Sequence, residues 1–333
     1  MKNHRIAIQI VCIVALLIGG CKESPKKPAG PAEKVTIGVA SQVLSAPVII
    51  AIEKGYFKDE GLEVTVKEYD FGKLCLDGMF ASEVDLATVA QMPVVLNSFK
   101  REDFSVVATF IYNYDDSKIV IRKDRGINSG ADLKGKTIGT PFGTSAHFFS
   151  DVYLDYSNIR RGDAKVVNFP AKDLPAALKD GTVDAISVFE PYAHETTKLL
   201  QDSASRLPKI EIFREAFNLA AMKDFLKKHP EVVEKVLRAI DRAVSFTKQN
   251  RAETIIILSR KLQVDEEFLE KAWDDYVLGL SLDQTLVLTL EDQARWAIKN
   301  KLTDKTKIPN YLDFIYPNGL RAVNPKAVTV IMK

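Results

Sequence analysis

The sequence is poor in cysteine and has no long uninterrupted apolar segment. Its three cysteines are Cys12, Cys21 and Cys75. The longest nearly apolar stretch, residues 6–18, is shorter than the ~20 residues that a membrane-spanning helix needs. If cleavage removes this stretch and Cys21 carries lipid, only Cys75 remains and no internal disulfide forms. The roughly 300 remaining residues are enough to stabilise a fold through a hydrophobic core alone.

The sequence also lacks an excess of charge of either sign. It has 46 Lys and Arg against 44 Asp and Glu, and Lys2 and Arg5 in the N-terminal segment account for the difference. Nucleic acid is therefore not expected as a partner. The four histidines are scattered, and there is no HExxH, no G-x-S-x-G with a placed histidine and no P-loop. These absences argue against a metal site, a catalytic triad or a cofactor, so no enzyme activity is expected.

The N-terminal segment has the organisation of a secretory signal. Lys2 and Arg5 are basic, residues 6–18 are almost entirely apolar, and the sequence IGGC follows at residues 18–21. This tetrapeptide resembles a bacterial lipobox, which implies cleavage before Cys21 and attachment of lipid to its sulfur. The alternative is an ordinary secreted protein with a chance cysteine at the cut. The predicted location is the periplasm or the cell surface, with the protein anchored to a membrane through Cys21.

Residues 22–33 form a proline-rich connection, KESPKKPAGPAE, that cannot bury a core and favours an extended backbone. At ~3.1 Å per residue, it would hold the folded part up to roughly 37 Å from the bilayer. We therefore predict a signal and lipobox over residues 1–21 and a tether over residues 22–33.

From Lys34 onwards, strand patterns alternate with helix patterns. Such alternation predicts βαβ units and a mostly parallel sheet. The expected strands are residues 35–39, 62–66, 84–89, 105–111, 118–121, 136–139, 165–169 and 185–188, with 210–213 as a further candidate. The expected helices are residues 47–57, 72–81, 92–99, 144–156, 174–179, 231–249, 251–262, 265–277 and 283–299. Because the pattern restarts after residue 117, we predict two α/β lobes with a crevice between them.

Six segments, in this order, resemble one known family. They are PVIIAIEKGYFKDEGLEVTV at residues 47–66, SEVDLA at 82–87, DLKGKTIG at 132–139, GTSAH at 143–147, GTVDA at 181–185 and EPY at 190–192. The family is that of the nitrate/sulfonate/taurine solute-binding proteins of ABC importers. The resemblance implies an α/β, two-lobe periplasmic-binding-protein-like fold of type II, with two crossovers and a central ligand cleft. Lobe one would comprise residues 34–115 and 217–333, and lobe two residues 116–216.

The resemblance also implies that the protein binds a solute without catalysing a reaction. A monomer would bind a small anionic or zwitterionic solute, such as a sulfonate, taurine or nitrate, and deliver it by lobe closure to an ABC permease and its ATPase. A ligand-sensing lipoprotein of the same fold is one alternative. A second is binding or synthesis of a thiamine-pyrimidine precursor, although synthesis by that related fold requires a cysteine-rich loop, and Cys75 is the only non-lipid cysteine here.

A candidate anion site runs through Gly143, Thr144, Ser145, Ala146 and His147. A glycine turn into a helix leaves backbone N–H groups unpaired, and the helix dipole adds partial positive charge at the same point. The alternative for Thr144 is a simple helix cap. His147 is either turned to the cleft or placed to solvate the helix end.

Other candidate ligand contacts follow the expected strands. Ser45 and Ala46 come after the first strand, where small side chains allow a ligand to approach the backbone. Gln91 follows the third strand, where its amide would orient a polar ligand. Asn113 lies in the first crossover, where polar residues also form ordinary solvated turns.

Glu190 is the single most specific candidate. It follows an apolar run and precedes Pro191, which places it at the rim of the cleft. There a carboxylate would suit the amine of a zwitterion, and the alternative is that Glu190 caps the following helix. Tyr192 and Phe217 are candidates to pack on the apolar part of a ligand, with burial in the core as their alternative.

Overall fold

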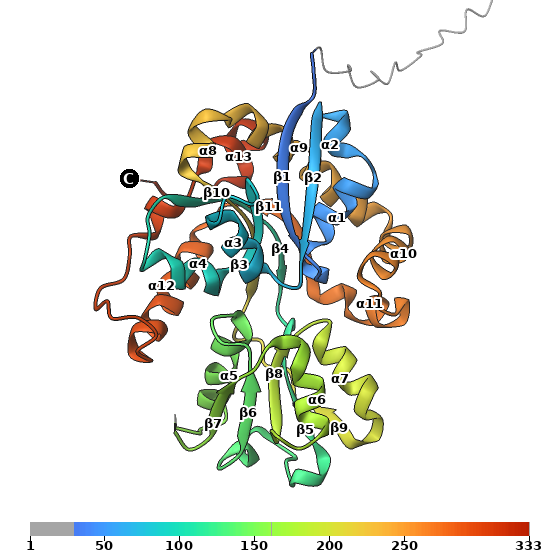
Figure 1. Ribbon diagram of the computed structural model, residues 1–333, viewed down its shortest axis with the longest axis vertical. Coiled ribbons are helices and arrows are strands. Elements are labelled where there is room, and N and C mark those ends of the chain that lie inside the picture. The colour runs from blue at the N-terminus through green and yellow to red at the C-terminus, as the bar shows by residue number, and fades with distance from the viewer. Residues whose placement is uncertain (1–29, 161, 333) are drawn as a thin grey trace, which may run out of the picture.

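The computed structural model describes residues 30–160 and 162–332 (Figure 1). The predicted signal, the lipobox with Cys21 and most of the predicted tether lie outside the described residues. None of the helices in the described part of the chain has the length and apolar character that a membrane crossing requires.

The strands form two separate sheets. The six-stranded sheet has the order β11-β4-β10-β3-β1-β2, and the five-stranded sheet has the order β7-β6-β8-β5-β9. The first contains β1 (Glu33–Ala40), β2 (Leu62–Tyr69), β3 (Leu86–Ala90), β4 (Phe104–Asn113), β10 (Glu215–Met222) and β11 (Tyr276–Ser281). The second contains β5 (Ser117–Arg122), β6 (Thr137–Thr140), β7 (Lys165–Asn168), β8 (Ala185–Phe189) and β9 (Ala204–Arg206). We call the parts of the molecule built on these two sheets lobe one and lobe two.

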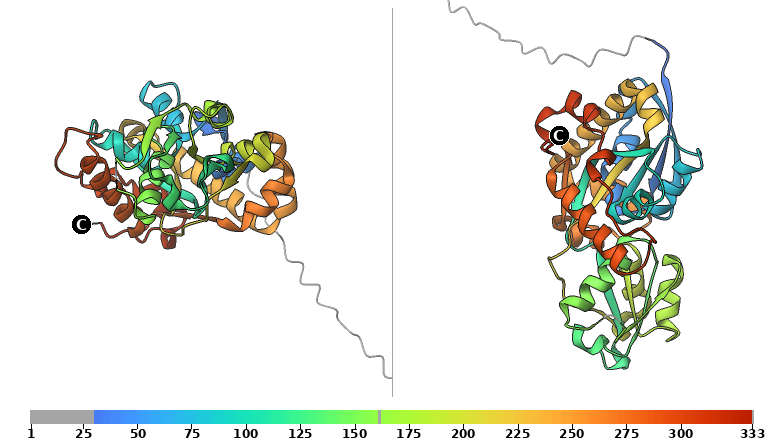
Figure 2. Two further views of the ribbon diagram at one scale, coloured as in Figure 1. Left: turned by 90° about the horizontal axis from the view of Figure 1, so that it is seen from below. Right: turned by 90° about the vertical axis from the view of Figure 1, so that its left-hand side faces the viewer.

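Helices cover the sheets of both lobes, which lie one above the other in Figure 1 and in the right-hand view of Figure 2. Lobe one carries α1 (Ala46–Glu53), α2 (Tyr56–Asp59), α3 (Gly72–Phe80), α4 (Gln91–Ser98), α8 (Lys223–Lys228), α9 (Pro230–Gln249), α10 (Arg251–Leu262), α11 (Glu266–Ala272), α12 (Gln284–Lys299) and α13 (Pro317–Val323). Lobe two carries α5 (Ser145–Tyr156), α6 (Leu174–Lys179) and α7 (Tyr192–Leu200).

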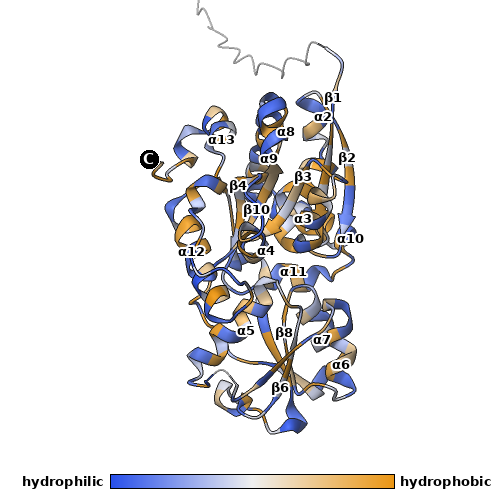
Figure 3. Ribbon diagram, turned by 60° about the vertical axis from the view of Figure 1, so that its left-hand side comes forward, coloured by the Kyte–Doolittle hydropathy of each residue, from blue (hydrophilic) through white to orange (hydrophobic). Residues whose placement is uncertain are grey.

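The central strands are buried on both faces. Every residue of β3, β4 and β8 is buried, and their sequences LATVA, FSVVATFIYN and AISVF are nearly continuous apolar runs. Such runs are expected where helices cover both faces of a sheet. The same strands are coloured as hydrophobic in the interior of each lobe in Figure 3. Burial of this apolar surface is what holds each lobe together.

The chain passes between the lobes twice, once from β4 to β5 and once from β9 to β10. Strands β4 and β10 pair antiparallel, with Asn113 opposite Glu215. The two crossovers therefore begin side by side, at the end of β4 and the start of β10.

Three local predictions are wrong. Residues 210–213 are not a strand, and the strand near this point is β10, whose sequence EAFNLAAM contains no β-branched residue. Its pairing with β3 on one side and β4 on the other overrides that weak local preference. The predicted helix over 265–277 ends at Ala272, and β11 begins at Tyr276. The predicted helix over 47–57 is interrupted at Gly55, whose φ of 70° is left-handed.

Candidate ligand-binding site

A narrow pocket lies between the lobes, where strands of both sheets end. Lobe one lines it with Gln42, Phe71 and Phe217, and lobe two lines it with Thr144, Ser145 and Phe189; Glu215 closes it at the second crossover. We call this space the narrow pocket. Its cavity volume is about 10 Å³, which is room for about one water molecule. The lobes are thus closed on one another at this point, and an organic ligand enters only if they separate.

Two of the predicted ligand contacts, neither of them in the lining of the narrow pocket, have buried polar atoms without partners. The Ser45 hydroxyl and Gln91 Oε1 are buried without a hydrogen-bond partner among the described residues. The other end of the Gln91 amide, Nε2, donates to the carbonyl of Arg214 at 2.9 Å, which fixes the side chain in place. Because a buried polar atom without a partner costs about 1–3 kcal/mol, each of these atoms calls for a partner such as a water molecule or a ligand.

Glu215 is the charged group that sequence reasoning missed. The residue is only 3% exposed, and Ser117 Oγ donates to its Oε2 at 3.1 Å. Burial raises the pKa of Glu215 to about 7, against the opposing effects of Ser145, Ser117 and Lys118. No local motif marks this residue. Only the register that places it opposite Asn113, at the start of a crossover strand, shows that it faces the cleft.

The start of α5 contributes Thr144 and Ser145 to the narrow pocket. Thr144 occupies the cap position, but its side chain makes no capping hydrogen bond. Instead the Thr144 hydroxyl donates backwards to the carbonyl of Pro141 at 2.7 Å. The simple side-chain cap considered for Thr144 is therefore wrong. The preceding Gly143 has a φ of 78°, the left-handed conformation that the turn into the helix requires.

Two of the predicted contacts in this segment lie away from the pocket lining. Ala146 is buried in the core of lobe two. The His147 ring stacks on Phe142, with ring centroids 4.1 Å apart and planes 8° apart, and lies edge-on to Trp296 of α12 at 5.2 Å. His147 therefore packs where α5 meets α12. Figure 3 shows these two helices next to each other.

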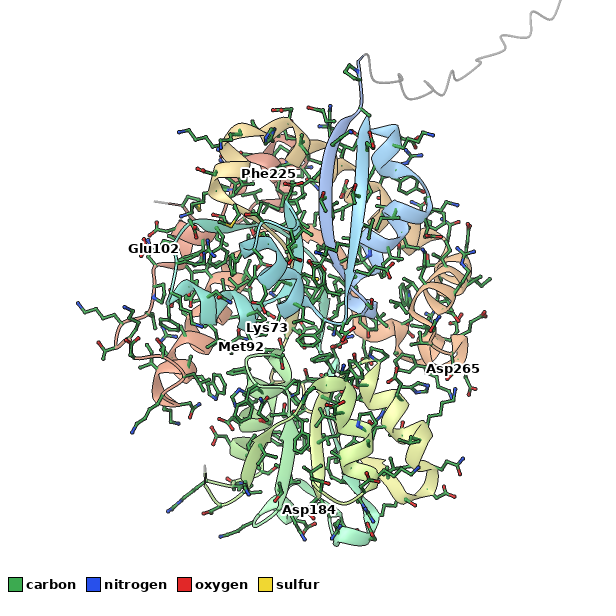
Figure 4. All side chains as sticks on the ribbon, viewed as in Figure 1. Lys73, Met92, Glu102, Asp184, Phe225 and Asp265 are labelled. Carbon is green, nitrogen blue, oxygen red and sulfur yellow. The ribbon has the colours of Figure 1, made fainter. Side chains whose placement is uncertain are left out.

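A second and larger space, which we call the wide cavity, also lies between the lobes, and its lining shares no residue with that of the narrow pocket. Its volume is about 900 Å³. Asn113, Lys118, Glu190 and Arg206 line it near the crossovers, and α11 lines its far side. Asp265, labelled in Figure 4 at the level where the lobes meet, belongs to that far side. Among residues 30–160 and 162–332, no group of three or more His, Cys, Asp and Glu side chains is arranged to hold a metal ion.

Glu190 caps α7, as the alternative interpretation of the sequence proposed. Its Oε2 accepts a hydrogen bond from the backbone N–H of His194 at 2.8 Å. Its Oε1 lies 3.1 Å from Arg206 Nη2 and 3.5 Å from Lys118 Nζ. With the side chain only 1% exposed, the carboxylate is buried and already engaged by the cap and two cations.

The remaining predicted ligand contacts pack against neighbouring residues of their own lobe. Tyr192 packs against Phe189 with ring centroids 5.8 Å apart, and burial raises the pKa of Tyr192 to about 12. Phe217 packs edge-on to Phe110 at 6.0 Å and also lines the narrow pocket. Ala46 is buried in the first turn of α1. Among the predicted contacts, Thr144, Ser145 and Phe217 thus line the narrow pocket, and Asn113 and Glu190 line the wide cavity.

Polar contacts join the lobes on both sides of the cleft. Asp265, the N-cap residue of α11, lies 3.0 Å from His194 Nε2 and 2.9 Å from Lys198 Nζ, both on α7. On the opposite side, Trp296 Nε1 of α12 donates to Asp151 Oδ2 of α5 at 3.0 Å. These contacts stabilise the closed arrangement of the two lobes.

The sequence profile of the NMT1/THI5-like family matches residues 42–254. The chain belongs to this family. That assignment agrees with the resemblance seen in the six sequence segments, and the matched range includes every residue that lines the narrow pocket.

Curated relatives in the comparison carry names of binding proteins. A Bacillus subtilis (strain 168) protein named "Putative aliphatic sulfonates-binding protein" is 25% identical over 308 residues, covering 90% of this chain and 91% of its own. The taurine-binding periplasmic protein of Escherichia coli (strain K12) is 25% identical over 211 residues, covering 61% and 63%.

Solved structures confirm the predicted fold class. The alkanesulfonate-binding protein SsuA from Xanthomonas axonopodis pv. citri, bound to MOPS, matches with a TM-score of 0.76 and 18% identity over 87% of this chain and 100% of its own. The desulfurization enzyme DSZB matches with a TM-score of 0.70 and 15% identity, covering 88% and 99%. The chain has the two-lobe periplasmic-binding-protein fold, and this fold alone does not separate binding proteins from enzymes.

Proposed function

We propose that this protein is the solute-binding component of an ABC importer, anchored to a membrane by lipid on Cys21. It binds a small anionic or zwitterionic solute of the sulfonate or taurine type between lobes one and two. The lobes close around the solute, and the closed form delivers it to a permease and its ATPase. We also retain as proposals the lobe boundaries expected from the sequence and the predicted contacts.

The observation that carries this proposal is the narrow pocket between the lobes. Residues of both lobes line it, and the start of α5 faces into it with a Thr144 side chain that makes no capping hydrogen bond. An acidic group of a bound ligand suits this helix start, because the N–H groups and the helix dipole there favour negative charge. The names of the relatives support a sulfonate or taurine-type solute.

The two lobes each contribute residues to the lining of the narrow pocket, which supports binding by lobe closure. Phe71 comes from lobe one and Thr144 from lobe two, so an open molecule exposes half a site on each lobe. A ligand that contacts both halves shifts the population towards the closed form by its differential affinity for that form. A ligand-sensing lipoprotein would use the same closure, and neighbouring permease and ATPase genes distinguish transport from sensing.

A thermal-shift screen of the purified protein tests the proposal. The panel comprises taurine, alkanesulfonates, nitrate, amino acids and thiamine precursors. A millimolar addition of a ligand with micromolar affinity stabilises a protein by about 4 kcal/mol, which raises Tm by several degrees. A shift with one ligand class supports solute binding and identifies the class. Protein shown to be ligand-free that responds to no member of the panel contradicts the sulfonate or taurine-type assignment.

A further inference from the structure

Three phenylalanine rings contribute to the lining of the narrow pocket, and they differ in what holds them in place. Phe217 is 1% exposed and belongs to the core of lobe one. Phe189 is 3% exposed and belongs to an apolar core cluster of lobe two. Phe71 comes from lobe one, directly before α3, and is only partly buried, yet its ring packs against the cluster of lobe two that contains Phe189. Phe71 is therefore a ring whose neighbours change when the lobes separate.

Phe71 and Phe189 meet across the cleft, with ring centroids 5.7 Å apart and ring planes inclined by 48°. Figure 4 labels Lys73, two residues after Phe71, at the level where the lobes meet. Aromatic pairs at such distances attract each other beyond the effect of the area that they bury. Phe189 is held in turn by Tyr192, which packs edge-on to it at 5.8 Å. In the closed arrangement the two rings are part of the wall of the narrow pocket, which leaves a volume of only about 10 Å³.

The backbone next to Phe71 is packed tightly against its own lobe. A Cβ atom on Gly72 would lie 3.0 Å from Val89 Cα and 3.1 Å from the carbonyl oxygen of Thr88, which are both backbone atoms of β3. The same Cβ would lie 3.1 Å from Cζ of Phe217. Such a close approach of two backbone segments calls for glycine. The start of α3 is thus fixed on β3, and this contact sets how far Phe71 reaches towards lobe two.

A solute in the narrow pocket shares this space with the ring of Phe71. The start of α5 suits an acidic group, and the rest of the solute then meets the phenylalanine rings. A short alkyl group allows the lobes to close with Phe71 in contact with both the solute and lobe two. A longer group holds Phe71 and Phe189 apart, and the closed form then loses their contact. Because a ligand favours closure only by its differential affinity for the closed form, this loss weakens binding.

We propose that Phe71 is a specificity-determining residue that limits the length of the apolar part of the solute. The protein then selects short-chain solutes of the sulfonate type over long-chain ones. This inference rests on the proposed function and deepens it, because it assigns the size of the solute to one side chain that crosses between the lobes.

The test measures binding of two series of compounds that differ only in chain length: methane-, ethane-, butane- and hexanesulfonate, and the corresponding aminoalkanesulfonates beginning with taurine. Calorimetry is performed on purified, ligand-free protein, for the native chain and for Phe71→Ala. A group that an apolar pocket does not accommodate weakens binding by about tenfold or more, so we expect the native chain to discriminate against the hexyl compounds by at least that factor. In Phe71→Ala the affinity should instead rise with chain length, by about fourfold for each methylene group that becomes buried.

Two further variants separate the size limit from a general loss of packing. Phe71→Leu keeps a smaller apolar side chain and should move the preferred chain length to an intermediate value. Phe80→Ala is the matched control, because Phe80 is the last residue of the same helix, packs edge-on to Phe104 at 5.2 Å and does not line the narrow pocket. Its order of affinities should remain that of the native chain even if its stability falls. Circular dichroism establishes that each variant is folded.

The outcomes distinguish the inference from the function on which it rests. Affinity of the native chain that rises steadily with chain length overturns the size limit and leaves solute binding intact. A variant Phe71→Ala that binds every compound more weakly by the same factor overturns the role of Phe71 in specificity, because that result indicates packing alone. Absence of binding of both series to the native chain overturns the proposed class of solute together with the size limit.

Discussion

Glu215 is almost completely buried, and its replacement by glutamine gives a sharp test of the electrostatics of the cleft. Burial raises its pKa from 4.5 to about 7, so the folded protein holds this proton more tightly than the unfolded chain does. The free energy of unfolding therefore falls as the pH rises from 4.5 through 7. Below that window both states are protonated, and above it the folded state carries a buried charge.

The size of the effect follows from this pKa change. One pKa unit corresponds to 1.36 kcal/mol, so ionised Glu215 costs the folded state about 3 kcal/mol at pH 8 and less than about 1 kcal/mol at pH 5. Glu215→Gln keeps an acceptor oxygen for Ser117 but cannot ionise. The variant should exceed the native chain in stability by about 3 kcal/mol at pH 8 and by little at pH 5.

Neighbouring charges change the size of this stability difference but not its sign. Asp116 is buried at the first crossover, and burial followed by the charge of Glu215 raises the pKa of Asp116 well above its usual range. Lys118 opposes both shifts, while Glu190 adds to the shift of Asp116. Because the amide in Glu215→Gln carries no charge, Asp116 ionises more easily in that variant, and this relief also appears above neutral pH.

Urea unfolding at pH 5, 6, 7 and 8, without ligand, measures the difference directly. Glu63→Gln serves as the control, since its exposed carboxylate should change the free energy of unfolding by less than about 0.5 kcal/mol at every pH. A difference between native chain and Glu215→Gln that stays constant from pH 5 to pH 8 would refute the reasoning. It would mean that Glu215 titrates alike in the folded and unfolded states.

Three other predictions follow from single residues. Asp265→Asn removes the link to His194 and Lys198; we expect a shift to a more open molecule, seen as a larger radius of gyration in X-ray scattering, with about 1 kcal/mol or less lost in stability. Cys21→Ala should abolish incorporation of labelled palmitate and release the protein from the membrane fraction. Burial raises the pKa of the Cys75 thiol to about 12, so we expect no reaction with a disulfide reagent at pH 8 until urea unfolds the protein.

The elements that the sequence predicted well are those with strong local patterns. Strands such as β3 and β8 are compact apolar runs, and α9 carries its buried residues on one face. Helix α5 was likewise predicted from its apolar face, and its start does line the pocket. In these segments the local preference and the tertiary environment agree, and the periodicity alone is sufficient.

Strands β10 and β11 are defined by pairing over long distances in the sequence. The segment EAFNLAAM becomes a strand because it fits between β3 and β4, and no local feature of the segment reveals that fit. The burial of Glu215 could not be predicted for the same reason, since Glu215 begins β10 and its burial depends on the register with β4. Glu190 was found because Pro191 marks a helix start, but its engagement by Arg206 depends on β9, which sequence reasoning also missed.

The position of Glu215 at a crossover has a consequence for how the site assembles. Ser117 begins β5 in lobe two, yet its hydroxyl donates to Glu215 at the start of β10 in lobe one. Both residues lie next to a crossover, so opening of the lobes displaces them less than it displaces Phe71 and Thr144, which line the pocket from separate lobes. If the lobes open and close as proposed, the carboxylate keeps its contact with Ser117 in the open form, and the contacts of Phe71 and Thr144 form on closure.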